Sequence, residues 1–243
     1  MSCLFILNGI WQLEYNYKLL KATVENVCCN LLVEAKLDDG QKVSAFCGAP
    51  DIAEQCVEGS IIWLKRTSNP HRLVKYNVAF IEVGDTIIFA NPKYDKHLFL
   101  EAFENNVLQE FDIYDECLPL EDDNSANGID FMLSNTNGDK CFVYATSIYL
   151  KRGSHAVFPH TINFFEMKVF EEMIKKKKQG AKVYVFLIVP RMDCVDAKFV
   201  WDISTLASGA VYNAAQDGVE FICYGCDISK DCIRIDHKLD ILY

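Results

Sequence analysis

The chain has 243 residues and a net charge of −10, with 51% hydrophobic and 24% charged residues. This length allows two domains or one large one, and the composition is that of an ordered protein without low-complexity segments. The acidic net charge disfavours sequence-independent nucleic-acid binding, which draws most of its free energy from cations that displace counterions. Neither a long apolar run nor a signal-peptide pattern is found, so we expect no membrane partner.

Eleven cysteines are scattered along the chain, mostly inside apolar runs. An odd count without regular spacing is typical of small buried side chains in a reducing compartment rather than of a disulfide framework. We therefore expect an intracellular, cytoplasmic protein, with a nuclear location left open.

Residues 1–90 have the pattern of a small β domain. Turn sequences such as DDG and SNPH separate five short runs that are rich in β-branched and aromatic residues. Short strands with this punctuation predict a small barrel or sandwich, with a domain boundary near residue 90. The five predicted strands lie at 29–37, 41–47, 59–67, 75–83 and 85–91.

The stretch from His97 to Asp139 contains eleven acidic residues and no lysine or arginine. Such a stretch repels phosphate and suits a cation or a basic partner surface. A merely solvated acidic face gives the same pattern.

Residues 91–243 alternate between helical and strand patterns. The apolar run 181–190 is typical of a fully buried central strand, and the whole order predicts an α/β domain with a mixed sheet. Lys175–Lys178 end the second helix, where they complement its dipole before Gly180 as a C-cap; phosphate binding is the alternative. Helices are predicted within 91–108, 161–180 and 202–218, and strands at 128–133, 140–150, 155–159, 181–190 and 219–229.

Asp130, in the segment GIDFML, precedes the strand-like run CFVYATSIYL at 141–150. An Asp followed by a hairpin and a second strand with Glu-x-Lys is how one large nuclease superfamily holds Mg²⁺, since residues i and i+2 share a strand face. Here the two positions hold Tyr144 and Thr146, which supply neither a hard anionic ligand nor a cation.

Six segments in register resemble motifs of the sugar fermentation stimulation protein A (SfsA) family. GIDFML resembles S-R-I-D-F-x-L, and CFVYATSIYL resembles C-Y-V-E-V-K-S-V-T-L. The resemblance implies an OB-like β-barrel at 1–90, a restriction-endonuclease-like (PD-(D/E)xK-type) domain with a mixed central sheet at 91–243, and DNA binding. The six segments are 68–76, 91–102, 128–133, 141–150, 157–161 and 218–229.

The departures from the family pattern fall on its functional positions. Tyr144 and Thr146 replace the family's Glu and Lys, Gly128 replaces an Arg, and His160 replaces the Asp of F-P-D, whereas Lys168 matches a Lys of the following helix. The resemblance therefore implies a retained scaffold with a degenerate site, and we expect neither an enzyme nor a cofactor.

Two alternatives stay open for Asp130. In a compensated metal-dependent nuclease, side chains from neighbouring elements would restore the metal site around it. As a structural remnant, Asp130 would accept a hydrogen bond from a backbone amide or lie exposed at a strand end. The candidates for compensation are Glu121, Asp123, Glu166, Lys168 and Glu171.

Cys223, Cys226, Cys232 and His237 have spacings that a zinc site could use. Cys223 and Cys226 fall in a predicted strand, where residues i and i+3 point to opposite faces unless a turn intervenes. The pattern thus favours buried thiols over zinc.

Basic and aromatic residues gather around one hairpin of the predicted barrel. OB barrels bind single strands by stacking bases on aromatic side chains inside a positive groove. A solvated hairpin gives the same pattern. The candidates are Trp63, Lys65, Arg66, His71, Arg72, Lys75 and Tyr76.

Three functional hypotheses follow. The first is a non-catalytic nucleic-acid-binding or nucleoprotein-associated protein. The second is a structural or adaptor subunit of a larger assembly, which docks a basic protein partner through residues 97–139. The third is a compensated metal-dependent nuclease.

Overall fold

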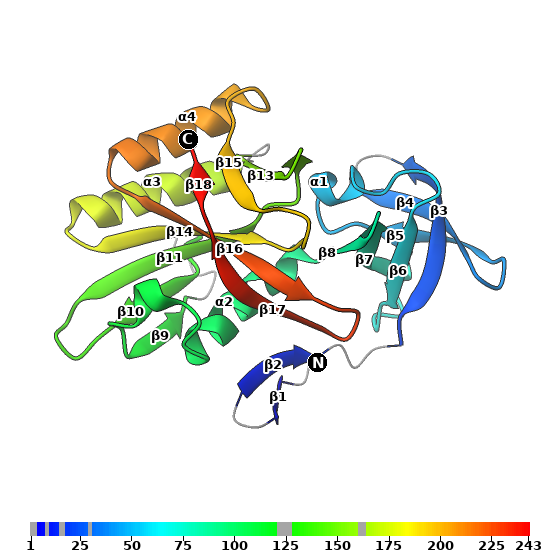
Figure 1. Ribbon diagram of the computed structural model, residues 1–243, viewed down its shortest axis with the longest axis horizontal. Coiled ribbons are helices and arrows are strands. Elements are labelled where there is room, and N and C mark those ends of the chain that lie inside the picture. Colours follow the sequence, from blue (N-terminus) through cyan, green and yellow to red (C-terminus); the bar gives the residue numbers. More distant parts are fainter. Residues whose placement is uncertain (1–3, 8–9, 15–17, 29–30, 121–127, 160–163) are drawn as a thin grey trace. The chain divides into compact units, whose positions relative to one another are not determined.

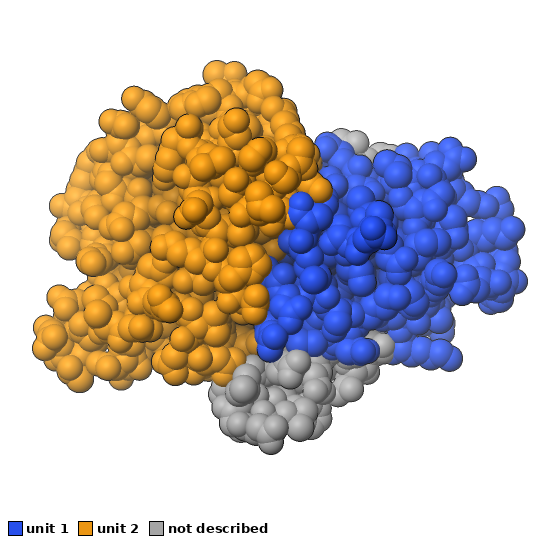
Figure 2. Space-filling view, in the orientation of Figure 1, with its two compact units in different colours: residues 1–94, 190–193, 226–234 blue, residues 95–189, 194–225, 235–243 orange. Residues whose placement is uncertain are grey.

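The computed structural model describes residues 4–7, 10–14, 18–28, 31–120, 128–159 and 164–243. The chain forms two compact units, coloured separately in Figure 2. The first contains residues 1–94, 190–193 and 226–234, and the second contains 95–189, 194–225 and 235–243. The sequence-based division at residue 90 assigns one continuous segment to each domain, whereas two later segments return to the first unit.

The first unit contains a five-stranded closed barrel (β3 to β7 in Figure 1). Its strands follow the order β5-β4-β3-β6-β7, and a parallel pairing of β5 with β7 closes the ring. This order, with a short helix between the third and fourth barrel strands, is that of the OB fold. The elements are β3 (Leu20–Cys28), β4 (Leu32–Leu37), β5 (Lys42–Phe46), α1 (Pro50–Ala53), β6 (Ile61–Arg66), β7 (Tyr76–Val83) and β8 (Thr86–Phe89), followed by the 3₁₀ turn η1 (Pro92–Tyr94).

The predicted barrel is confirmed in class but corrected in one strand. Strand β3 is missing from the sequence prediction, because only Ala22 and Val24 of its nine residues are buried and the charged Lys21 and Glu25 flank them. The strand predicted at 85–91 corresponds to β8, which pairs with β7 outside the closed ring.

The segment 190–193 contacts the barrel through backbone hydrogen bonding and a buried arginine. The N–H of Phe89 donates to the carbonyl of Pro190 at 3.0 Å. The guanidinium of Arg191 is 2% exposed, donates twice to Asp193 at 2.6 and 2.9 Å, and reaches Gln55 at 3.2 Å. The returning segment therefore adds to the barrel sheet and to the turn after α1.

The second unit is built on a mixed sheet, as the sequence predicts. Its strands follow the order β17-β16-β14-β11-β10-β9, and β14 runs parallel to both of its neighbours. Strands β1 (Leu4–Leu7) and β2 (Ile10–Glu14) pair with each other, and β2 pairs with β17 within the first unit. The sheet strands are β9 (Glu116–Pro119), β10 (Phe131–Ser134), β11 (Lys140–Ser147), β14 (Lys182–Val189), β16 (Glu220–Ile228) and β17 (Cys232–Leu239).

Helices cover both faces of this sheet (Figure 1): α3 (Phe164–Lys178) and α4 (Thr205–Gln216) lie on one face, and α2 (Asp95–Glu104) with the turn η2 (Gln109–Phe111) on the other. Successive residues of β14 point to opposite faces, so Val185 packs in the cluster with α3 and α4. Phe186 meets Phe99 edge-on at 5.0 Å and Phe111 at 6.5 Å on the α2 side. The predicted central strand is thus buried on both faces.

A small second sheet flanks the helices, with the order β12-β13-β15-β18. The sequence predicts only one of its strands, β13. Strands of two to four residues seldom carry enough periodicity to be recognised. Strand β17 is likewise missing from the prediction. The members of the small sheet are β12 (Lys151–Arg152), β13 (His155–Phe158), β15 (Asp196–Phe199) and β18 (Ile241–Leu242).

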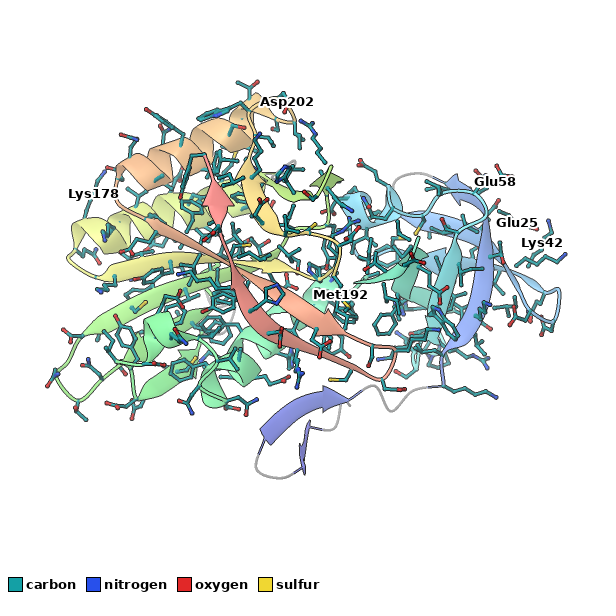
Figure 3. All side chains as sticks on the ribbon, in the orientation of Figure 1. Glu25, Lys42, Glu58, Lys178, Met192 and Asp202 are labelled. Carbon is teal, nitrogen blue, oxygen red and sulfur yellow. The ribbon has the colours of Figure 1, made fainter. Side chains whose placement is uncertain are left out.

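The two predicted helix stops are confirmed: Gly180 and Gly218 have φ of +91° and +87°, a conformation that favours glycine. Each of the four lysines at the end of α3 lies near a carboxylate. Lys178, labelled in Figure 3, pairs with Asp217 at 3.2 Å. The other pairs are Lys175 with Glu172 at 3.2 Å, Lys176 with Glu172 at 3.9 Å and Lys177 with Glu220 at 3.8 Å.

Among the described helices, none is long and apolar enough to cross a membrane. The nine cysteines in the described part of the chain are free thiols.

Candidate functional site

Asp130 directly precedes β10, and both of its carboxylate oxygens have partners. Its side chain is 5% exposed; Oδ2 accepts from the N–H of Ala145 at 2.8 Å, and Oδ1 forms an ion pair with Nζ of Lys96 at 2.9 Å. Lys96 comes from the first turn of α2 and is 44% exposed. Both carboxylate oxygens are therefore engaged by the protein itself.

Asp95, the first residue of α2, accepts hydrogen bonds from β11 in the same way as Asp130 does. It is buried, and its two oxygens accept from the N–H and the hydroxyl of Ser147 at 2.9 and 2.7 Å. Strand β10 pairs with β11 only as far as Val143. Beyond that point, the carboxylates of Asp130 and Asp95 accept the hydrogen bonds of β11 that a neighbouring strand would otherwise accept.

Tyr144 and Thr146, at the family's Glu and Lys positions, lie on β11. The Tyr144 ring meets Phe170 of α3 edge-on at 6.4 Å. Burial raises the pKa of the Tyr144 phenol, and the negative charges of Glu166 and Asp130 raise it further, so the group stays a neutral hydroxyl. A neutral phenol is a poor ligand for Mg²⁺.

The described residues around Asp130 do not fit the metal ion that the fold family implies. In the described part of the chain, no group of three or more His, Cys, Asp and Glu side chains is arranged to hold a metal. Of the candidates for compensation, Glu166 lies in the first turn of α3 near Tyr144, and Lys168 and Glu171 follow on the same helix. The remaining candidates, Glu121 and Asp123, lie outside the described residues, and so does His160, which replaces the Asp of F-P-D.

The zinc candidates are not brought together as a ligand set. Cys223 and Cys226 lie three apart in the continuous strand β16, and both are buried. His237 of β17 lies against Gly225, where an added Cβ would come within 2.8 Å of the imidazole ring. Burial raises the pKa of the Cys223 thiol, which disfavours the thiolate that zinc needs.

The barrel candidates divide into two groups. The Trp63 side chain makes two contacts within its own unit. Its indole N–H donates to Glu82 at 2.8 Å, and Nζ of Lys230 lies 4.0 Å from the ring centre. The Trp63 hydrogen bond, together with Lys230, lowers the pKa of Glu82. Trp63 therefore has a structural role here rather than the open ring that base stacking requires.

The second group lies where the barrel closes. Phe46 of β5 and Lys65 of β6 are the register neighbours of Asn77 on β7, so the three side chains stand in a row across three strands. Arg72, from the loop between β6 and β7, lies over the Phe46 ring at 5.5 Å and donates to Asn77 at 3.1 Å. The loop between the last two strands is one of the places where OB barrels bind oligonucleotides.

This loop, residues 67–75, is closed by its own hydrogen bonds. The N–H of Thr67 donates to the carbonyl of Lys75 at 2.8 Å, and Nζ of Lys75 donates to the carbonyl of Pro70 at 2.6 Å. His71 and Lys75 are exposed, and Leu73 between them is 98% exposed. The candidates Arg66 and Tyr76 form a register pair at the base of the loop.

Three residues of these sites are missing from the sequence prediction. Lys96 belongs to a segment with the pattern of a helix entry, while Phe46 and Leu73 occupy ordinary apolar positions. Lys96 and Phe46 owe their roles to a side chain of another element, and only its local exposure distinguishes Leu73.

The acidic stretch 97–139 is partly internal. Glu101 and Asp130 are buried, and Glu110 accepts from the Tyr224 hydroxyl at 2.6 Å and pairs with Lys238 at 2.5 Å. These three carboxylates do not face solvent as a docking surface would require. Docking of a basic partner stays a prediction, which depends on the exposed Glu104, Asp112, Asp115, Glu116 and Asp139.

A closed OB barrel joined to a mixed sheet with helices on both faces, and with an Asp at the start of its second antiparallel strand, defines the class of restriction-endonuclease-like proteins with an N-terminal barrel. The family described as "Sugar fermentation stimulation protein RE domain" matches residues 93–232, more than half of the chain. The chain belongs to this family.

Curated relatives and a solved structure agree with this assignment. The sugar fermentation stimulation protein homolog of Paramagnetospirillum magneticum is 27% identical over 222 residues, which cover 91% of this chain and 94% of the relative. The homolog of Saccharophagus degradans is 25% identical over 236 residues and is covered completely. The structure of Pyrococcus furiosus SfsA in complex with Ca²⁺ matches with a TM-score of 0.79 at 16% identity, covering 95% of this chain and 98% of that one, which shows the fold.

The Lys96–Asp130 ion pair predicts that Asp130→Asn has opposite effects on stability in the presence and in the absence of Lys96. Lys96→Met removes the cation that pairs with a buried carboxylate, so it should lower the free energy of unfolding by about 1–2 kcal/mol, a value kept small because Lys96 is half-exposed. Asp130→Asn should destabilise the wild type but stabilise the Lys96→Met protein, since it removes a buried charge that has lost this cation.

Urea denaturation of the four proteins measures this cycle. Lys198→Met, which removes an exposed lysine of the same unit, is the control. Equal destabilisation by Asp130→Asn in both backgrounds would show that the ion pair does not hold Asp130.

Proposed function

We propose that this protein binds single-stranded nucleic acid through its barrel and does not cleave it. The observation that carries the proposal is the convergence of Phe46, Lys65 and Arg72 beside the β6–β7 loop. An aromatic ring with cations around it, at a ligand position of the OB fold, is the composition that single-strand binding requires.

The charge distribution supports this assignment to the barrel. Residues 18–94 contain nine Lys and Arg and nine Asp and Glu, so the acidic excess of the chain resides elsewhere. Within residues 59–81 there are four basic residues, Lys65, Arg66, Arg72 and Lys75, and no acidic one. The net charge of −10 therefore does not describe the local field at the loop, where a phosphate backbone would approach.

The absence of cleavage is supported by the state of Asp130. A metal ion would have to displace the Lys96 ammonium and the Ala145 N–H, and it would find a phenol and a hydroxyl where the fold family supplies Glu and Lys. Ca²⁺ is present in the Pyrococcus furiosus structure. In the present chain, the fixed positive charge of Lys96 lies against the carboxylate that a cation would need.

Two cations of the loop should determine the salt dependence of binding. Arg72→Ala plus Lys75→Ala should reduce the slope of log affinity against log salt by about 1.4, the value for two phosphates on a single strand. Fluorescence anisotropy with labelled oligonucleotides between about 50 and 200 mM salt measures the slope.

The matched control is Lys178→Ala plus Lys198→Ala, which removes the same charge from the second unit and should leave the slope unchanged. Failure of the wild type to bind any strand at low salt would refute the proposal. An equal loss in both double variants would show that only the total charge matters.

Leu73 should contact bases rather than phosphates. Leu73→Ser should weaken binding about tenfold, the effect of losing roughly half of a buried leucine side chain, with no change in the salt slope. Val57→Ser, which replaces a 62% exposed residue of the same unit, is the control and should bind as the wild type does. A reduced slope, or an unchanged affinity, would exclude an apolar contact at Leu73.

Strand cleavage should be absent in Mg²⁺, Mn²⁺ or Ca²⁺. A labelled single strand and its duplex, incubated with the protein and each metal, should stay intact on denaturing gels. Cleavage that requires a divalent metal and disappears in Asp130→Asn would establish the compensated nuclease instead. Cleavage that survives this substitution would indicate a contaminating enzyme.

A further inference from the structure

A cavity of about 420 Å³ opens on the barrel beside the row of Phe46, Asn77 and Lys65. This volume lies within the range of about 300–1,000 Å³ that small-molecule sites occupy. Three cationic side chains line the cavity, from β6, the loop and the segment after β8, and among its described lining residues none is Asp or Glu. The polar and aromatic lining consists of Phe46, Lys65, Arg72, Asn77, Asn91 and Lys93.

The guanidinium of Arg72 is fixed in place before any ligand arrives. The Phe46 ring lies under it and Asn77 accepts one of its hydrogen bonds. An arginine fork presents several N–H donors in one plane, which matches the oxygens of a phosphate group. Because the fork is already ordered, less side-chain entropy is lost when an anion binds.

The opposite wall of the cavity depends on Gly48. An added Cβ at this position would lie 2.6 Å from Cδ of Pro92, so only glycine lets the two segments approach this closely. This contact brings Asn91 and Lys93 to the cavity that Lys65 and Arg72 also line. Three segments that are distant in the sequence therefore meet around one space.

We propose that this cavity binds the terminal phosphate of a single strand, that is, a phosphomonoester at a nucleotide end. The inference rests on the proposed function and names the part of the ligand that the barrel recognises. A phosphomonoester carries a charge of about −1.5 to −2 near neutral pH, whereas each internal phosphodiester carries one negative charge. Three converging cations match the more highly charged group better.

The environment of Lys65 supports an anionic occupant. Burial lowers the pKa of its ammonium group, which means that the charged form is poorly solvated at this position. A phosphate oxygen within hydrogen-bond distance would stabilise this charged form.

The experiment compares three single strands of the same sequence, about 12 nucleotides long, within the range of OB site sizes. One carries a 5′-phosphate, one a 3′-phosphate, and one only hydroxyl ends. At least one phosphorylated strand should bind the wild type about tenfold more tightly than the hydroxyl strand, as expected for hydrogen bonds to a charged group. The same measurement is made on Lys65→Met and Lys93→Met, with thermal unfolding as the check that each variant folds.

Both variants should bind the three strands with equal affinity. The control is Lys42→Met: Lys42 lies in the same unit but outside the cavity, and Glu25 neutralises it at 2.8 Å; both are labelled in Figure 3. This variant should keep the preference for the phosphorylated end. Loss of the preference in the control as well would assign it to overall charge and overturn the inference.

A titration with free dAMP and with deoxyadenosine separates failure of the cavity from failure of the proposed function. Binding of dAMP but not of deoxyadenosine, lost in Lys65→Met, supports the phosphate site whatever the strands do. Equal binding of all three strands by the wild type overturns the inference and leaves the proposed function standing. If dAMP binds and no strand does, the cavity is a mononucleotide site, and both the strand-end assignment and the proposed function are overturned.

Discussion

The central sheet depends on acceptors for the N–H groups of Ala145 and Ser147, which strand β10 is too short to reach. A buried N–H without an acceptor costs as much as a lost hydrogen bond or more. Two carboxylates, Asp130 and Asp95, accept these bonds, and Lys96 balances the charge of the first. The requirement gives the acidic residue that precedes β10 a structural role that does not depend on a metal ion.

The same three groups connect the sheet to its first helix. Asp95 and Lys96 both belong to the first turn of α2, so one turn of helix supplies the acceptor for Ser147 and the cation for Asp130. These contacts make Asp130 part of a structural junction in which a protein cation lies against its carboxylate. Tyr144, neutral because of burial and nearby negative charge, packs on Phe170 and contributes to the core.

The polar residues of the barrel have a different role from those around Asp130. In the β6–β7 region, the charged and aromatic side chains are half-buried or exposed, and two of them, Lys65 and Arg72, border a cavity. Trp63 is the exception, since Lys230 and Glu82 engage both its ring and its N–H. The same OB topology therefore contains one aromatic residue with a structural role and another, Phe46, that orders an arginine beside an open site.

The sequence by itself determined the class of both units, the buried strand β14 and the glycine stops of α3 and α4. These features depend on local periodicity, turn chemistry and residue type at fixed spacing, which the chain carries within a few residues. Tertiary structure alone decided the partner of Asp130, the return of 190–193 and 226–234 to the first unit, and the meeting of Gly48, Arg72 and Lys93 around one cavity. Strand pairing and helix packing bring such residues together across tens of positions, and no local pattern encodes those contacts.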